Sequence, residues 1–360
     1  MEAKVLGSPA KLYRRTAEDR IVCTACARYC TLKNNQVGLC GVRGVVDNQL
    51  RLFVYGKVIT GHVDPIEKKP VTHYRPGTKI FSIATTGCNW LCAYCQNFDI
   101  SQRRKVEGVD APPERVVEMA LRYGSDGIAY TYNEPSIFME YAHDIGVIAR
   151  RKGLINVFVT NGYWTPEAVG MAAEFLDCAT VDFKGSGEKR FVQRYIGIPD
   201  AEPVFQTLLE IKRTKIHVEI TDLIVPEIGD SLEAARRLCR WVYENLGQET
   251  PIHFLRFHPD YKLLHLPWTP VETLEKHCQI AREEGLLYVY VGNVPGHPLE
   301  NTYCPGCGKV VVERHGYDIL DWRLDKDNRC LECGSQVHIV GRPPSKKVSG
   351  RLRFIPVNLE

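Results

Sequence analysis

The sequence predicts an α/β protein built around a partial barrel of parallel strands, with a small cysteine-rich segment at each end. Between residues 79 and 291 short apolar runs alternate with amphipathic ones, a pattern typical of consecutive βα units. Separate groups of cysteines precede and follow this stretch. A chain of 360 residues that is 44% hydrophobic and 25% charged can bury a full core and has the composition of a soluble globular protein.

The apolar runs predict seven strands, and the amphipathic runs predict six helices. The strands are expected at residues 79–84, 127–132, 156–160, 179–183, 216–225, 252–257 and 286–291. The helices are expected at residues 113–123, 136–152, 166–175, 203–214, 231–246 and 271–284, with Pro or Ser at several of their starts. Six βα units and one further strand suit a partial barrel better than a closed one of eight units.

We expect the chain to divide into three parts. These are an N-terminal cysteine-rich segment (1–78), the barrel (79–298) and a C-terminal domain similar to a zinc ribbon (299–360). The proline-bracketed stretch 64–70 indicates a connector into the barrel. The sequence has no run of 18 apolar residues, and its N-terminus lacks the apolar region of a signal peptide. A cytoplasmic location without membrane contact is therefore expected.

Charge and cysteine content narrow the classes of partner. The formal charge of +3 is too small to favour nucleic acid, and the basic run at 346–353 is more often a solvated end than a polyanion site. Of the fourteen cysteines, eleven fall into three groups. In a cytosolic chain of this size, clustered cysteines indicate metals rather than disulfides.

The two outer cysteine groups differ in regularity. The C-terminal group consists of two Cys-x2-Cys pairs 22 residues apart, which is typical of a structural zinc site. The N-terminal group lies within 18 residues and predicts a metal or a cluster, with zinc and iron–sulfur both open and structural zinc slightly favoured. The C-terminal ligands are Cys304, Cys307, Cys330 and Cys333, and the N-terminal ones are Cys23, Cys26, Cys30 and Cys40.

The middle group, Cys88, Cys92 and Cys95, directly follows the first predicted strand, and barrels place their active sites at that end of their strands. Three thiolates leave one iron of a [4Fe–4S] cluster open, and an open metal position marks a site that transforms a ligand. The alternatives are a zinc site completed by a residue such as His73, or a redox pair of Cys92 and Cys95. The spacing, with Tyr94 before the last cysteine, resembles the signature of the radical S-adenosylmethionine (SAM) enzymes.

In that family the open iron is chelated by the methionine part of SAM, so the resemblance implies cofactor-binding residues at the ends of other strands. Asn133 and Glu134 end the second predicted strand, Asn161 follows the third, and Asp182 and Lys184 end the fourth. The last two segments are similar to those of enzymes that activate glycyl-radical proteins. A helix N-cap is the alternative for the first pair, and an internal ion pair for the last.

The fifth and sixth predicted strands are unusually polar for a core. His217 and Glu219 share one face of the fifth strand because side chains alternate along a strand. Arg256, His258 and Asp260 gather at the end of the sixth strand and predict a set of side chains that faces the substrate.

Together these segments resemble the radical SAM member of the so-called AmmeMemoRadiSam group, a relative of the pyruvate formate-lyase activating enzymes. The resemblance covers nearly the whole chain and implies a (βα)6 TIM-like barrel of the radical SAM type, a [4Fe–4S] cluster and SAM. The segments that carry it are 40–43, 64–70, 95–97, 131–135, 159–162, 256–261, 292–296 and the C-terminal cysteine pairs.

The resemblance also implies a reaction. A low-potential donor of the ferredoxin or flavodoxin type supplies one electron, SAM is cleaved reductively, and the 5′-deoxyadenosyl radical abstracts hydrogen from a substrate that the sequence does not identify, with a protein as one candidate. One alternative is an activase for a glycyl-radical partner protein. Another, from a different class, is a non-catalytic module with zinc at all three cysteine groups.

Overall fold

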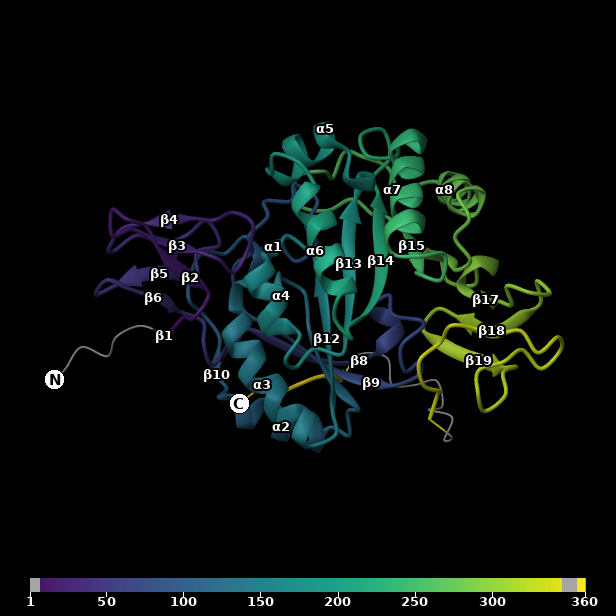
Figure 1. The fold of residues 1–360 in the computed structure, drawn as a ribbon, viewed down its shortest axis with the longest axis horizontal. Coiled ribbons are helices and arrows are strands. Elements are labelled where there is room, and N and C mark those ends of the chain that lie inside the picture. The colour runs from purple at the N-terminus through teal and green to yellow at the C-terminus, as the bar shows by residue number, and fades with distance from the viewer. Residues whose placement is uncertain (1–6, 345–354, 360) are drawn as a thin grey trace.

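The computed structural model describes residues 7–344 and 355–359, and its centre is a nine-stranded sheet (Figure 1). The basic run at 346–353 lies outside the described residues. Seven neighbouring strands are parallel and follow one another in chain order across the sheet. They are β9 (Lys79–Ala84), β11 (Gly127–Tyr130), β12 (Ile155–Thr160), β13 (Cys178–Lys184), β14 (His217–Ile224), β15 (Ile252–Arg256) and β16 (Val289–Gly292).

One helix lies between each pair of consecutive parallel strands, apart from short extra turns. The six are α2 (Pro113–Arg122), α3 (Met139–Arg151), α4 (Pro166–Ala172), α6 (Glu202–Lys212), α7 (Leu232–Asn245) and α8 (Val271–Glu283). The predicted α/β class, with six βα units and one further strand, is therefore confirmed. Strand β11 is buried at all four of its residues, as expected for parallel strands covered on both faces.

Local sequence sets where the helices begin. Thr165 caps α4, because its side chain accepts a hydrogen bond from the Ala168 amide at 3.1 Å. Ser231 caps α7 in the same way at 3.3 Å. The predicted helix 136–152 begins later than expected, since residues 135–138 form a 3-10 turn before α3. That turn holds the chain at the carboxyl end of β11.

Two antiparallel strands extend the parallel sheet at one edge. Strand β8 (Thr60–Pro65) pairs with β9, and β20 (Ile355–Pro356) pairs with β8. The connector that follows β8 is thus fixed beside the first barrel strand. The division of the chain at residues 78 and 298 stays a prediction.

The cysteine-rich ends lie at opposite ends of the long axis in Figure 1. The N-terminal part consists of two small antiparallel sheets, β1-β6-β5 and β2-β3-β4, and of strand β7, which pairs with β10 from the stretch after β9; the C-terminal part contains the sheet β17-β18-β19. Their strands are β1 (Ser8–Pro9), β2 (Tyr13–Arg15), β3 (Ile21–Cys23), β4 (Thr31–Leu32), β5 (Arg43–Val46), β6 (Gln49–Leu52), β7 (Lys57–Val58), β10 (Val109–Asp110), β17 (Thr302–Tyr303), β18 (Val310–His315) and β19 (Asp318–Trp322).

Buried polar contacts attach both ends to the barrel. In the N-terminal part, Arg43 forms an ion pair with Glu140 of α3, and both side chains are buried. The C-terminal part is attached through His73, which precedes β9. The ring of His73 bonds to the His338 carbonyl at 2.7 Å and to the Tyr290 hydroxyl of β16 at 2.5 Å. Burial lowers the pKa of His73 to about 3, so the ring is neutral and donates to one partner while it accepts from the other.

Among the described residues, no helix has both the length and the apolar character needed to cross a membrane.

Candidate active site

A cavity of about 540 Å³ lies at the carboxyl ends of the parallel strands, within the size range of small-molecule sites. It brings together all twelve side chains that the sequence predicts for the cluster, the cofactor and the substrate. They are Cys88, Cys92, Cys95, Tyr94, Asn133, Glu134, Asn161, Asp182, Lys184, Arg256, His258 and Asp260.

The three cysteines of the middle group lie on the loop after β9. Burial raises the pKa of Cys88 well above its usual value and that of Cys92 to about 12, and neighbouring thiols add to both effects. Thiols in such surroundings become thiolates only beside a compensating cation. Cys95 accepts or donates a hydrogen bond with Ser101 at 3.1 Å. The donor set therefore fits a metal cluster, and three thiols leave one iron of a [4Fe–4S] cluster open.

His73 is not a further ligand of this group. Both of its ring nitrogens already have partners, the His338 carbonyl and the Tyr290 hydroxyl, and it does not line the cavity. The zinc alternative for the middle group thus lacks the ligand that the sequence suggested for it.

Glu134 is buried at the carboxyl end of β11 and receives many donors. Its oxygens accept hydrogen bonds from the Thr160 hydroxyl at 2.8 and 2.9 Å, from the Asn161 amide at 2.8 Å and from the Trp164 indole at 2.9 Å. It also caps the 3-10 turn through the Ser136 amide at 3.0 Å. These donors fill the accepting positions of a carboxylate, so Glu134 fixes the end of β12 in place.

Asn133 and Asn161 hold the cysteine loop against the neighbouring strand ends. The Asn133 side chain donates to the Gly87 carbonyl at 2.8 Å, next to Cys88. The Asn161 side chain donates to Asn89 on the other side of Cys88 at 2.7 Å. Within the described residues the Asn133 Oδ1 atom is buried without a hydrogen-bond partner, which leaves it free to accept a donor from a bound group.

Asp182 and Lys184 form the ion pair that the sequence allowed as an alternative. The Lys184 ammonium lies 3.0 Å from an Asp182 oxygen, and the Thr221 hydroxyl donates to the other oxygen. Both charged side chains are about one-fifth exposed or less, at 21% and 16%, and both line the cavity. The pair can therefore also meet a ligand.

Arg256, His258 and Asp260 line the same cavity and are partly exposed. Arg256 donates to the Thr269 carbonyl at 2.9 Å, and His258 lies 3.0 Å from Asp260. The side chain of His258 is 39% exposed. Their contact with a substrate stays a prediction.

The sequence analysis missed one polar cluster in the cavity wall. Asp64 of β8 accepts hydrogen bonds from Lys68 at 2.9 Å, from Lys69 at 2.7 Å and from the Tyr132 hydroxyl at 2.8 Å. Burial lowers the pKa of Lys69 to about 8, although Asp64 opposes this shift. Two adjacent lysines between prolines could have indicated this cluster, but we interpreted the stretch only as a connector.

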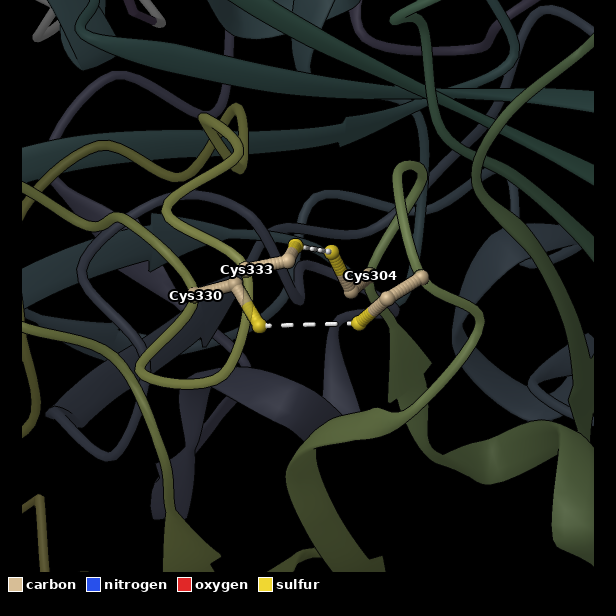
Figure 2. A group of neighbouring side chains, drawn as sticks. Cys304, Cys330 and Cys333 are labelled. Atoms are coloured by element: carbon tan, nitrogen blue, oxygen red, sulfur yellow. Dashed lines mark hydrogen bonds between the residues drawn. The ribbon is translucent and has the colours of Figure 1, made fainter.

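The C-terminal cysteines meet in one compact group, and their sulfur atoms face one another from two loops (Figure 2). The Cys304 and Cys333 sulfurs are 3.5 Å apart, and those of Cys307 and Cys330 are 3.8 Å apart. Four thiolates around one zinc at 2.3 Å stand about 3.8 Å from one another. The group therefore has the size of a mononuclear metal site.

The N-terminal cysteines also gather, in a separate cavity. Cys23, Cys26, Cys30 and Cys40 all line it, together with Asn89, which follows Cys88. Three of the four are buried.

Comparisons with known proteins agree with this geometry. Residues 82–242 match the family model of the radical SAM superfamily. An uncharacterized protein of Methanocaldococcus jannaschii is 42% identical over 334 residues, which cover 92% of this chain and 99% of that protein.

Solved structures with a similar arrangement include a domain of a pyruvate-formate lyase-activating enzyme from Bacteroides vulgatus. It is 15% identical, has a TM-score of 0.41, and the match covers 47% of this chain and 100% of that one. A radical SAM methyltransferase from Sphaerobacter thermophilus is 15% identical with a TM-score of 0.47, over 60% of this chain and 66% of that one.

A protein with an α/β parallel sheet and three cysteines in an open cavity at its strand ends is equipped for cluster-based chemistry. This chain belongs to the radical SAM superfamily. Membership in that superfamily makes it an enzyme of SAM-dependent radical chemistry with a [4Fe–4S] cluster.

Proposed function

We propose that this enzyme cleaves SAM reductively at a [4Fe–4S] cluster held by Cys88, Cys92 and Cys95, and that the resulting 5′-deoxyadenosyl radical abstracts hydrogen from a substrate. The observation that carries the proposal is the single cavity in which these thiols meet the polar ends of five strands. The cluster, when bound, supplies the electron that breaks the carbon–sulfur bond of SAM.

The chain's own residues bind and orient SAM and shield the site from water. The free Oδ1 atom of Asn133 is placed to accept a hydrogen bond from the ammonium of SAM. Glu134 holds the Asn161 amide and the Thr160 hydroxyl at the end of β12, so it positions the cofactor wall. Trp90 and Tyr94 are only 4% and 6% exposed, and this apolar cover keeps water away from the cysteine loop.

The substrate side of the cavity carries the more exposed charged groups. We assign Arg256, His258 and Asp260 to substrate contact because they line the cavity and are partly exposed. Lys69 also lines the cavity but is buried. Burial lowers the pKa of its ammonium to about 8, so it can hold or release a proton close to neutral pH.

We assign structural zinc to Cys304, Cys307, Cys330 and Cys333 on the basis of their spacing. The zinc would hold the C-terminal sheet, in which the Thr302 hydroxyl of β17 hydrogen-bonds to the Tyr290 hydroxyl of β16 at 2.8 Å.

We infer that the electron comes from a ferredoxin- or flavodoxin-type donor and that the chain works in the cytoplasm. We place it in the AmmeMemoRadiSam group, with a protein among the candidate substrates. If the chain is instead an activase of a glycyl-radical partner, mixing the two proteins with SAM should produce a stable backbone radical in electron paramagnetic resonance.

The direct test is 5′-deoxyadenosine production by anaerobically reconstituted protein. We expect a brown protein that releases 5′-deoxyadenosine from SAM and dithionite, and a Cys92→Ala variant that releases none. The matched control is Cys239→Ala, which removes a buried thiol of α7 outside the cavity and should keep the activity. Equal product from the Cys92→Ala variant would overturn the ligand assignment. A colourless protein with zinc at all three groups would point to the non-catalytic binding module.

A further inference from the structure

The N-terminal cysteine group differs from the C-terminal one in the distances between its thiols. Among the described residues, Cys304, Cys307, Cys330 and Cys333 form the one set of three or more candidate ligand atoms that all lie within 4.8 Å of one another. The N-terminal thiols line one cavity, but no three of their sulfur atoms all lie within 4.8 Å of one another. The sulfurs of a zinc site lie about 3.8 Å from one another, so the N-terminal sulfurs are spread more widely than those of one four-cysteine zinc site.

A [4Fe–4S] cluster needs that wider spacing, because each thiolate binds a different iron at a corner of the cube. Cys88, Cys92 and Cys95 provide an internal comparison. They belong to the superfamily's cluster site and also fall outside the compact set. The N-terminal thiols are therefore arranged like the cluster ligands of the barrel and unlike the compact C-terminal group.

Three residues that line the cavity between the N-terminal thiols each have a side-chain nitrogen without a hydrogen-bond partner in the described part of the chain. Arg28 Nη2, Arg43 Nη1 and Asn89 Nδ2 are buried, and none has a hydrogen-bond partner within the described residues. The side chains of Arg43 and Asn89 are 1% and 0% exposed. Buried donors are nearly always satisfied, and the sulfides and thiolates of an iron–sulfur cluster are anionic acceptors that would satisfy them.

We propose that Cys23, Cys26, Cys30 and Cys40 hold a second iron–sulfur cluster of the four-iron type, which corrects the slight preference for zinc that the spacing alone suggested. Arg28 supplies part of its counter-charge, whereas the charge of Arg43 is already paired with Glu140. The proposal does not depend on SAM cleavage in the barrel.

The location brings this second site close to the first. Arg28 donates to the Asn89 carbonyl at 2.9 Å, and Asn89 follows Cys88 directly. A methyl group added at Gly87 would lie 2.4 Å from the Cys40 carbonyl, so the two cysteine loops touch at their backbones. The left-handed conformation of Gly87, with φ of +88°, permits this approach.

The first experiment counts metals in the unaltered chain after anaerobic reconstitution with iron, sulfide and zinc. We expect about eight iron atoms and about one zinc per chain, and crystals measured at the iron and zinc absorption edges should show iron at the N-terminal site. About four iron atoms with two zinc ions would overturn the proposal, and so would an N-terminal site without metal.

The second experiment uses a Cys88→Ala, Cys92→Ala, Cys95→Ala variant of the full chain. It should keep about four iron and four sulfide and the charge-transfer colour, and adding Cys30→Ala should remove them while the zinc content stays the same. If the unaltered chain carries iron at the N-terminal site but releases no 5′-deoxyadenosine, the second cluster stands and the proposed reaction fails. If SAM is cleaved while zinc occupies the N-terminal site, the proposed reaction stands and the second cluster fails.

Discussion

Replacing Glu140 by glutamine should destabilise the protein strongly, because this carboxylate neutralises a buried arginine. The side chains of Arg43 and Glu140 are 2% and 4% exposed. Glu140 also accepts hydrogen bonds from the Lys11 amide at 2.9 Å and the Leu12 amide at 3.1 Å. The Arg43 charge holds the pKa of Glu140 below its usual value, although burial acts in the opposite direction.

The size of the effect follows from what the substitution leaves behind. The Glu140→Gln amide keeps the shape of the carboxylate but turns a donor toward Arg43 and removes the only charge paired with it in the described residues. Breaking a buried pair from one side costs about 3–5 kcal/mol, a large share of a total stability of about 5–15 kcal/mol. For a chain of 360 residues the entropy of unfolding is about 0.76 kcal/mol/K, so the midpoint of thermal unfolding should fall by roughly 4–7 °C.

The assay is thermal unfolding of the metal-loaded chain under anaerobic conditions, followed by circular dichroism. Glu233→Gln is the matched control, because Glu233 pairs with Arg237 on the surface of α7, where the side chains are 85% and 60% exposed. Such pairs are worth about 0–1 kcal/mol, so the control should shift the midpoint by no more than about 2 °C. A Glu140→Gln shift as small as the control's would refute the reasoning.

Three further predictions test other parts of the chain. Burial raises the pKa of Glu67 from 4.5 to about 7, so the folded state binds the proton more tightly than the unfolded state. The free energy of unfolding should therefore fall by roughly 3 kcal/mol as pH rises from below 4.5 through 7. Urea unfolding between pH 5 and 8 should show most of this pH dependence lost in Glu67→Gln, and an unchanged dependence would contradict the assignment. A methyl group at Gly146 of α3 would lie 2.1 Å from the Phe175 ring, so Gly146→Ala should destabilise the protein by about 1–3 kcal/mol. A methyl group at Gly170 would have nothing within 4 Å, so Gly170→Ala should be neutral or stabilising by up to about 1 kcal/mol. Equal unfolding midpoints for the two variants would argue against the packing of Gly146 on Phe175. Cys307→Ser should lower zinc from about one to none per chain, and retention of zinc would refute the compact site.

The order of the strands and the contents of the cavity could be predicted because both follow from local patterns. The spacing of apolar residues distinguishes strands from helices, and the carboxyl ends of parallel strands lie at one edge of the sheet. Asn133, Asn161 and Asp182 come from three different strands, and each could be assigned to that edge without any knowledge of contacts. Proximity then followed from topology alone.

The contacts that could not be predicted join segments far apart in the chain. Tyr132 reaches Asp64 across 68 positions, and this requires the antiparallel pairing of β8 with β9, which no periodicity reveals. Glu219 was predicted only to share a strand face with His217. In the structure it accepts hydrogen bonds from the Thr72 and His73 amides, 147 and 146 positions away, so it anchors the segment between the connector and β9.

An open sheet of seven parallel strands needs other segments to complete the wall of its cavity. Lys68, Lys69 and Pro70, which precede β9, form one part of that wall, and Tyr317, in the turn between β18 and β19, forms another. The cysteine-rich ends therefore do more than flank the barrel, because the elements beside them cover the place where a radical would form. Shielding of that kind is what SAM-dependent radical chemistry requires of its protein. The buried Arg314 of β18 helps to fix this part of the wall, because it donates to the Thr72 carbonyl, two residues after Pro70, at 3.3 Å.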